Sequence, residues 1–347
     1  MYKNVIKVIL LCFSLILLSA CTNTDKEMNM NESAKSNETE ITSDSTETTD
    51  TNLNSIDLRE SDESTETKDI VNVWEEFCRI DAGVCGGILF DKEGNMLVAR
   101  PFALDKVSLD GTVTTFCDLS ALEKGRNYVF KSPFIWDMKY DNDNNIIAAA
   151  QDRIVKITDD GKVTTLIKED FNGFLGASGL EIDQEGNIYV VNGGKVYRYS
   201  PDLDKSEYIS SSDYDSFFSI AFSPDHKYLY LTDFHSMALI KYEINPDGSV
   251  GKGTEIIREP VKNSGSFGAP LNMIFDNSGN MYVSIDGMAT ILKIDQNDNL
   301  TLINMNQPIG NHIIAFGNKE FGEDFLYFTT YSEKVCKFKL DEDNEQR

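Results

Sequence analysis

The stretch GLEIDQEGNIYVV, from Gly179 to Val191, consists of two short apolar segments separated by the turn sequence Gln-Glu-Gly-Asn. Five other stretches of the chain follow the same scheme, and they begin at Ile88, Met138, Ile220, Met273 and Ile313. The repeats are about 40 to 50 residues apart, which is the length of one propeller blade. The sequence therefore predicts six blades.

Within the third repeat, four segments have the composition of short strands: LEID, IYVV, KVYRY and SEYIS. One four-stranded sheet leaves both of its faces uncovered, whereas six sheets around an axis cover one another. We expect an all-β fold, a six-bladed β-propeller of four-stranded antiparallel blades, over residues 70–347.

The first turn of each of the first five repeats carries a residue type that adopts positive φ readily. These residues are Gly94, Asn144, Gly186, His226 and Gly279. His226 is accordingly interpreted as a turn residue and not as a catalytic base.

The sixth repeat offers only three strands, at 313–316, 325–330 and 335–340. We expect residues 71–80 to pair with residues 335–340, so that an N-terminal strand closes the last blade. Cys78 and Cys336 would then lie on neighbouring strands, where they form either a disulfide or two buried thiols.

The N-terminal part of the chain has a different character. Residues 1–20 combine two lysines with a short apolar run, as in a secretion signal. The sequence Leu-Ser-Ala-Cys that ends at Cys21 resembles the lipobox of bacterial lipoproteins, which implies that Cys21 is acylated. Residues 21–69 are acidic and rich in Ser and Thr, so we expect a disordered tether. The protein would face outward from a bacterial cell membrane.

The formal net charge is −25. Nucleic-acid binding requires cationic groups that neutralise phosphates, so we exclude this class of function. We also expect the protein to be a monomer. Beyond Cys12 and Cys21, the cysteines are Cys78, Cys85, Cys117 and Cys336. None forms a CxxC pair, so neither a zinc site nor a redox motif is indicated.

The phrases GLEIDQEGNIYVVNGGKVYRYSPD, SIAFSPDHKYLYLTD and PLNMIFDNSGNMYVS resemble the senescence-marker-protein-30/gluconolactonase family over about residues 83–340. The resemblance implies a six-bladed propeller and metal-dependent sugar-lactone hydrolysis, with a divalent cation such as calcium or zinc on the central axis. In this family, carboxylate and amide side chains two positions before the first apolar residue of the inner strands hold the ion.

The matching positions of this chain lack that ligand set. They are Gly86, Trp136, Ser178, Phe218, Leu271 and His312. Hard cations require several oxygen ligands, so the sequence predicts that the metal site of the family is lost.

One position further along, Asp137, Ser219 and Asn272 are polar. Two interpretations are open for them. Asp137 and Asn272 could form a rebuilt metal site together with His312, or they could hydrogen-bond to backbone groups at the strand starts.

The two sets of positions together predict either a ligand pocket with aromatic walls or a closed channel. The candidate ligand-binding residues are Trp136, Asp137, Ser178, Phe218, Ser219, Asn272 and His312. Our primary hypothesis is a surface lipoprotein that binds a small sugar-like or lactone-like molecule, or a protein partner, at the channel mouth. The alternatives are a lactonase or ester hydrolase with a rearranged metal site, whose catalytic residues are unknown, and a purely structural interaction domain.

Overall fold

The computed structural model describes residues 69–72, 74–80, 86–122, 133–171, 176–260, 268–286, 288, 290–305, 311–330 and 333–340, and of residues 69–72, 305, 311 and 312 it gives the backbone only. All of these residues belong to one compact unit, Thr67–Arg347. The predicted signal peptide, Cys21, the tether up to residue 68 and Cys85 lie outside the described residues. In the described ranges, no helix is long and apolar enough to cross a bilayer.

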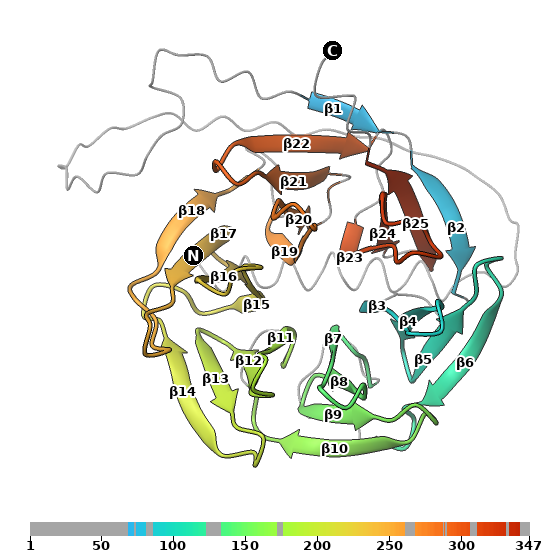
Figure 1. Ribbon diagram of the computed structural model, residues 1–347, viewed down its shortest axis with the longest axis horizontal. Coiled ribbons are helices and arrows are strands. Elements are labelled where there is room, and N and C mark those ends of the chain that lie inside the picture. The colour runs from blue at the N-terminus through green and yellow to red at the C-terminus, as the bar shows by residue number, and fades with distance from the viewer. Residues whose placement is uncertain are drawn as a thin grey trace, which may run out of the picture. The chain divides into compact units, whose positions relative to one another are not determined.

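Six antiparallel sheets surround a central axis, as the repeat predicts (Figure 1). The described part of the chain forms strands and no helices. From the inner to the outer strand, the blades are β3 (Ile88–Phe90), β4 (Met96–Arg100), β5 (Ala103–Val107) and β6 (Val113–Asp118); β7 (Asp137–Tyr140), β8 (Ile146–Ala149), β9 (Arg153–Ile157) and β10 (Val163–Lys168); β11 (Leu180–Ile182), β12 (Ile188–Asn192), β13 (Lys195–Tyr199) and β14 (Lys205–Ser210); β15 (Phe217–Phe222), β16 (Tyr228–Asp233), β17 (Ala238–Glu243) and β18 (Thr254–Arg258); β19 (Pro270–Phe275), β20 (Met281–Ile285), β21 (Thr290–Ile294) and β22 (Leu300–Met305); β23 (Asn311–Phe316), β24 (Phe325–Thr330), β25 (Lys334–Lys339) and β2 (Glu75–Arg79).

The repeated phrase produces the turn between the first two strands of a blade. In the third blade, an Asp183 carboxylate oxygen accepts a hydrogen bond of 2.8 Å from the backbone N–H of Asn187, and Gly186 has a φ of 83°. Asp91 and Asn95 make the same bond in the first blade, at 2.7 Å. The predicted turn residues Gly94, Asn144, His226 and Gly279 also have positive φ. The interpretation of His226 as a turn residue is therefore confirmed.

Both faces of each sheet are covered by the neighbouring sheets. Between blades one and two, for example, Leu97, Leu104, Met138 and Val155 pack in one buried cluster. Equivalent clusters fill the other five junctions. Burial of this apolar surface is the main source of stability in such a ring, because no blade has a core of its own.

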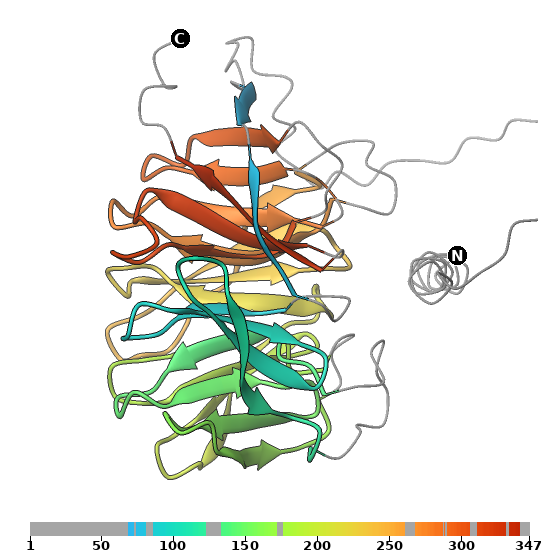
Figure 2. The same ribbon diagram turned by 90° about the vertical axis from the view of Figure 1, so that its right-hand side faces the viewer.

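The two ends of the domain meet in the sixth blade. Strand β2 pairs antiparallel with β25, with Glu75 opposite Lys337 and Arg79 opposite Lys334. This pairing confirms the predicted closure of the last blade by an N-terminal strand. The prediction is wrong at its first residues: β1 (Asp69–Asn72) pairs in parallel with β22, as a fifth strand of blade five. Figure 2 shows β1 and β2, in blue, following one another along the edge of the ring.

Cys78 and Cys336 are both free thiols, so the disulfide alternative does not hold in this structure. A bulge in β2 sets Cys78 opposite Val335 and places Cys336 one position further along. Because successive side chains of a strand point to opposite faces, Cys78 packs with Val335 between blades six and one. Cys336 packs between blades five and six. Burial raises the pKa of each thiol to about 12.

Candidate functional site

The predicted site residues lie on the inner strands of blades two to six, or directly before them, at the end of the ring where these strands begin. The side chains of six of them are described: Trp136, Asp137, Ser178, Phe218, Ser219 and Asn272. For the seventh, His312 in β23, the backbone alone is described. The fold therefore brings the predicted positions to one end of the axis.

Trp136 and Phe218 belong to an apolar cluster at this end of the axis. The cluster contains Phe134, Trp136, Phe218, Leu271 and Ile313, and Phe234 packs against it. The ring centroids of Trp136 and Phe218 are 5.8 Å apart, and their exposed fractions are 2% and 4%. Among the described residues, the two rings thus contact each other and their neighbours and do not line an open pocket.

The polar residues beside this cluster connect adjacent blades. Asp137 Oδ2 accepts a hydrogen bond of 3.1 Å from the backbone N–H of Leu180 in the next blade. Its Oδ1 accepts a bond of 2.8 Å from the N–H of Met138. In the same way, Asn272 Oδ1 accepts a bond of 3.1 Å from the N–H of Ile314. These oxygens thus accept hydrogen bonds from backbone N–H groups at the first residues of the strands. This is the second of the two predicted alternatives.

The two serines also connect neighbouring strands. Ser178 Oγ donates a hydrogen bond of 2.9 Å to the carbonyl oxygen of Phe218. The backbone N–H of Ser219 donates to Thr232 Oγ1 at 3.0 Å, and this hydroxyl donates to the carbonyl oxygen of Leu271 at 2.7 Å. These bonds connect blades three, four and five at this end of the axis.

Two glycines allow the inner strands to approach closely. A Cβ atom at Gly86 would overlap the carbonyl oxygen of Ile135 and lie 2.8 Å from ring carbons of Phe134. A Cβ atom at Gly179 would lie 2.6 Å from the carbonyl oxygen of Phe218. The neighbouring blade thus occupies the space that any side chain at position 86 would need. This holds also for the carboxylate ligand that the resembling lactonases carry at this position.

These contacts decide whether the residues present fit a divalent cation. Both carboxylate oxygens of Asp137 and the amide oxygen of Asn272 already accept backbone hydrogen bonds. Over the described ranges, no three or more His, Cys, Asp or Glu side chains gather as a metal would require. The described donor set at the axis does not fit the metal of the lactonases, because a hard cation requires several oxygen ligands directed at one point.

Further along the axis, a lysine lies between two carboxylates. Lys139 Nζ is 3.3 Å from Asp137 Oδ1, and 27% of its side chain is exposed. Burial lowers the pKa of Lys139, but the charges of Asp137 and Glu181 outweigh this effect and raise it above its usual value. Burial raises the pKa of Glu181, and Lys139 partly opposes that rise. The three groups form an ion cluster between the inner strands of blades two and three.

One polar pair at the rim was not predicted from the sequence. His235 Nδ1 is 2.8 Å from Asp215 Oδ1, and the imidazole is 40% exposed. His235 directly follows Phe234, which packs on the apolar cluster. The available signal was its position just after strand β16, since the turns between the second and third strands of each blade lie at this same end.

Comparison with known proteins agrees with this architecture. Residues 138–332 match the model of the SMP-30/Gluconolactonase/LRE-like region. The match thus covers blades two to five and the first two strands of blade six, and it leaves out the first blade, which carries Gly86. No curated protein has a significant sequence match to the chain.

Several solved structures share the fold. A gluconolactonase from Xanthomonas campestris aligns with a TM-score of 0.61 and 16% identity, over 77% of this chain and 89% of that one. The calcium-binding protein regucalcin from Agrobacterium tumefaciens aligns with a TM-score of 0.61 and 15% identity, over 78% and 94% of the two chains. An auxiliary nutrient binding protein from Bacteroides thetaiotaomicron aligns with a TM-score of 0.57 and 12% identity, over 75% and 69%. At these identities the similarity concerns the fold alone.

Proposed function

Because the chain belongs to the SMP-30/gluconolactonase/LRE-like family, we propose that it is a binding member of this family of propellers. A lipid on Cys21 holds it at the outer side of a bacterial membrane. Its ligand is a small sugar-like or lactone-like molecule, recognised at the end of the ring where the inner strands begin. The proposal includes no metal-dependent hydrolysis.

The observation that carries the proposal is the closed apolar cluster at the axis. Phe218 and Leu271 stand at positions where the resembling lactonases hold their metal, and they pack together with Trp136. In the resembling lactonases a cation stabilises the oxyanion that develops in lactone hydrolysis, and here the oxygens of Asp137 and Asn272 accept backbone hydrogen bonds. Binding requires only shape and a few polar groups, so it is compatible with this arrangement.

The described rim offers groups for such binding. Phe102, in the turn between β4 and β5, is one of the few exposed large apolar side chains, with an exposed fraction of 40%. The His235–Asp215 pair adds a hydrogen-bonding group at the same end. Phe102 belongs to blade one and His235 to blade four, on opposite sides of the ring, so each offers a separate contact point for a ligand, and the polar pair is the one that we test. The shared fold of a nutrient binding protein is consistent with a binding role.

Tryptophan fluorescence gives a direct test, because Trp74 and Trp136 are the two tryptophans of the chain. Trp74 lies in the sixth blade, where it packs on Phe328. The Trp74→Phe variant therefore leaves Trp136 as a single reporter at the axis. Titration with aldoses, aldonates and aldonolactones should change its emission saturably for at least one compound, and His235→Ala should weaken that binding about tenfold.

The enzymatic alternative is tested on the same protein. After incubation with Ca²⁺, Zn²⁺ or Mn²⁺ and dialysis, we expect far less than one metal ion per chain. We also expect lactone hydrolysis at the uncatalysed rate. Metal-stimulated turnover that Asp137→Asn or Asn272→Ala abolishes would establish the enzyme and end the proposal.

A further inference from the structure

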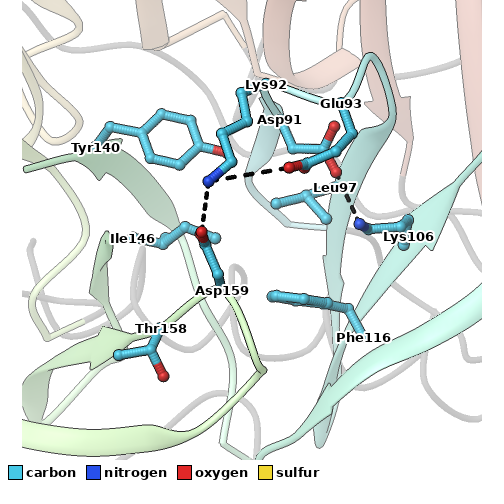
Figure 3. A pocket seen from close by; sticks show the side chains of 10 residues that line it. All are labelled: Asp91, Lys92, Glu93, Leu97, Lys106, Phe116, Tyr140, Ile146, Thr158 and Asp159. Carbon is cyan, nitrogen blue, oxygen red and sulfur yellow. Dashed lines mark hydrogen bonds and ion pairs between the residues drawn. The ribbon is translucent and has the colours of Figure 1, made fainter. Parts of the chain in front are cut away.

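A cavity lies towards the end of the ring that is opposite to the apolar cluster. It has a volume of about 110 Å³ and lies at the junction of blades one and two. Most of its residues come from strand ends and turns where the inner strands finish, and Figure 3 shows their side chains. It is therefore separate from the rim proposed above.

The inner walls of the cavity are apolar. Leu97 and Ile146 are buried members of the core between the two blades. The rings of Phe116 and Tyr140 stand on either side of them. A pocket of this kind accepts an aliphatic or aromatic body of a few carbon atoms, since a protein cavity of about 150 Å³ holds benzene.

The outer wall carries charge of both signs. Lys106 Nζ is 2.9 Å from Asp91 Oδ2, and the corresponding residues of the second blade, Lys156 and Asp141, form the same pair at 3.0 Å. Because this pair recurs in both blades, we assign it to the scaffold. What remains at the opening is Lys92, with two further carboxylates.

Lys92 crosses from one blade to the other. Its Nζ is 2.5 Å from Asp159 Oδ2 in the second blade and 3.9 Å from Glu93 Oε1 in its own. Figure 3 shows the ammonium group between these carboxylates, beside the Tyr140 ring. The side chains of all three charged residues are more than half exposed, so the lysine side chain is able to swing outward into solvent.

From this arrangement we propose that the cavity binds a small organic ammonium ion, and that Lys92 occupies the ammonium position when no ligand is bound. The carboxylates of Asp159 and Glu93 receive the ligand's ammonium group, and the apolar walls receive its carbon chain. Carboxylates and aromatic faces are the groups that favour an ammonium ion.

The charges of the lining select this class of ligand. The cavity has three carboxylates against two ammonium groups, and one of the latter is bound within the scaffold pair. Burial raises the pKa of the Tyr140 hydroxyl, and the same carboxylates raise it further, so that the hydroxyl stays neutral. An anion would be repelled, and a neutral alcohol would gain a hydrogen bond from the carboxylates without the attraction between opposite charges.

The test uses the full chain and n-butylammonium chloride, which has the length and charge of the lysine side chain. Binding is measured by calorimetry at constant ionic strength, with n-butanol and sodium butyrate as comparison compounds. We expect millimolar binding of butylammonium alone. In Lys92→Ala, where the ligand no longer competes with the protein's own ammonium group, the affinity should rise at least about fivefold.

Lys227→Ala is the matched control, because Lys227 pairs with Asp225 at 2.9 Å in an exposed turn of blade four that does not line this cavity. Its affinity for butylammonium should equal that of the unmodified protein. Adding Asp159→Asn to Lys92→Ala should reverse the gain while the melting temperature stays within a few degrees. Equal binding of butylammonium and butanol, or the same gain in Lys227→Ala, would overturn the proposal.

Discussion

Gly86→Glu would return to the chain the carboxylate that the resembling lactonases carry at this position, so it tests whether the axis has room for a metal ligand. A Cβ atom there would overlap the Ile135 carbonyl oxygen and lie 2.8 Å from the Phe134 ring. Carbon atoms in contact are normally about 3.5 to 4.0 Å apart, so the inner strands of blades one and two would have to separate by about 1 Å.

Overpacking of this kind costs about 1 to 3 kcal/mol when side chains yield, and here one obstacle is backbone. We therefore expect a loss of about 3 kcal/mol in the free energy of unfolding, or about 6 °C in melting temperature for a domain of this size. Gly86→Ala should lose nearly as much, because the Cβ atom alone causes the overlap.

The assay is thermal unfolding followed by circular dichroism, with and without 1 mM CaCl₂. Gly251→Ala is the control, because a Cβ atom at Gly251 would lie 3.8 Å from the nearest atom, the Glu243 carbonyl oxygen. A Gly86→Glu protein as stable as this control, or one that calcium stabilises, would refute the argument that the neighbouring blade excludes a ligand.

Three further predictions concern the anchor, the ring closure and the ion cluster. Cys21→Ala should abolish metabolic lipid labelling and release the protein from membranes; unchanged labelling would contradict lipidation at this residue. Deletion of residues 71–80 removes β2 with the buried Cys78 and Ile80 and should cost at least about 4 kcal/mol in urea unfolding, whereas deletion of residues 22–64 should be nearly neutral. Equal midpoints for the two deletions would disprove the role of β2. For Lys139→Met, we expect a loss of about 2 kcal/mol at pH 7.5, because Asp137 and Glu181 then remain without their cation. Burial raises the pKa of Glu181 above its ordinary 4.5, so the cost of its ionisation is absent below pH 4.5 and complete once the pH exceeds the raised value. The loss should accordingly be less than half as large at pH 4, and an equal loss at both pH values would contradict the assignment.

The blades could be predicted from the sequence because the repeats contain residues that favour a tight turn between the first two strands. Gly186 and His226 have very different side chains, but the turn requires a positive φ at this position, and both residues have it. Strand β2 was predicted from the same comparison of repeats. The last repeat lacked a fourth strand, and an apolar segment was available at the other end of the domain.

The placement of β1 could not be predicted in this way. Its four residues, Asp69–Asn72, follow an acidic segment and form too short a pattern to indicate a partner. That Cys78 and Cys336 are free thiols could not be predicted either, because it depends on a bulge in β2. A shift of one residue moves the Cys78 side chain to the other face of its strand. No sequence pattern reports such a bulge.

For the site, the sequence identified the positions and left their contacts undecided. Trp136 was predicted at the axis, where it lies, but whether an inner-strand side chain faces open space or a neighbouring ring depends on how closely the blades approach. That distance is set by Gly86 and Gly179, whose missing side chains permit backbone contact. The hydrogen bonds of Asp137 and Asn272 follow from the same approach.

The pairing of β2 with β25 also has a consequence for the order of events during synthesis. Strand β2 is made before every strand of the ring except β1, and its partner β25 is the last of the described strands to be made. Contacts between the two ends of a chain form slowly, because a long loop must close before they contribute any stability. The segment that contains β2 must therefore wait unpaired while five blades are made. If the chain is exported, as we propose, the ring is complete only after β25 has crossed the membrane, and until then the unpaired β2 is exposed to chaperones and proteases.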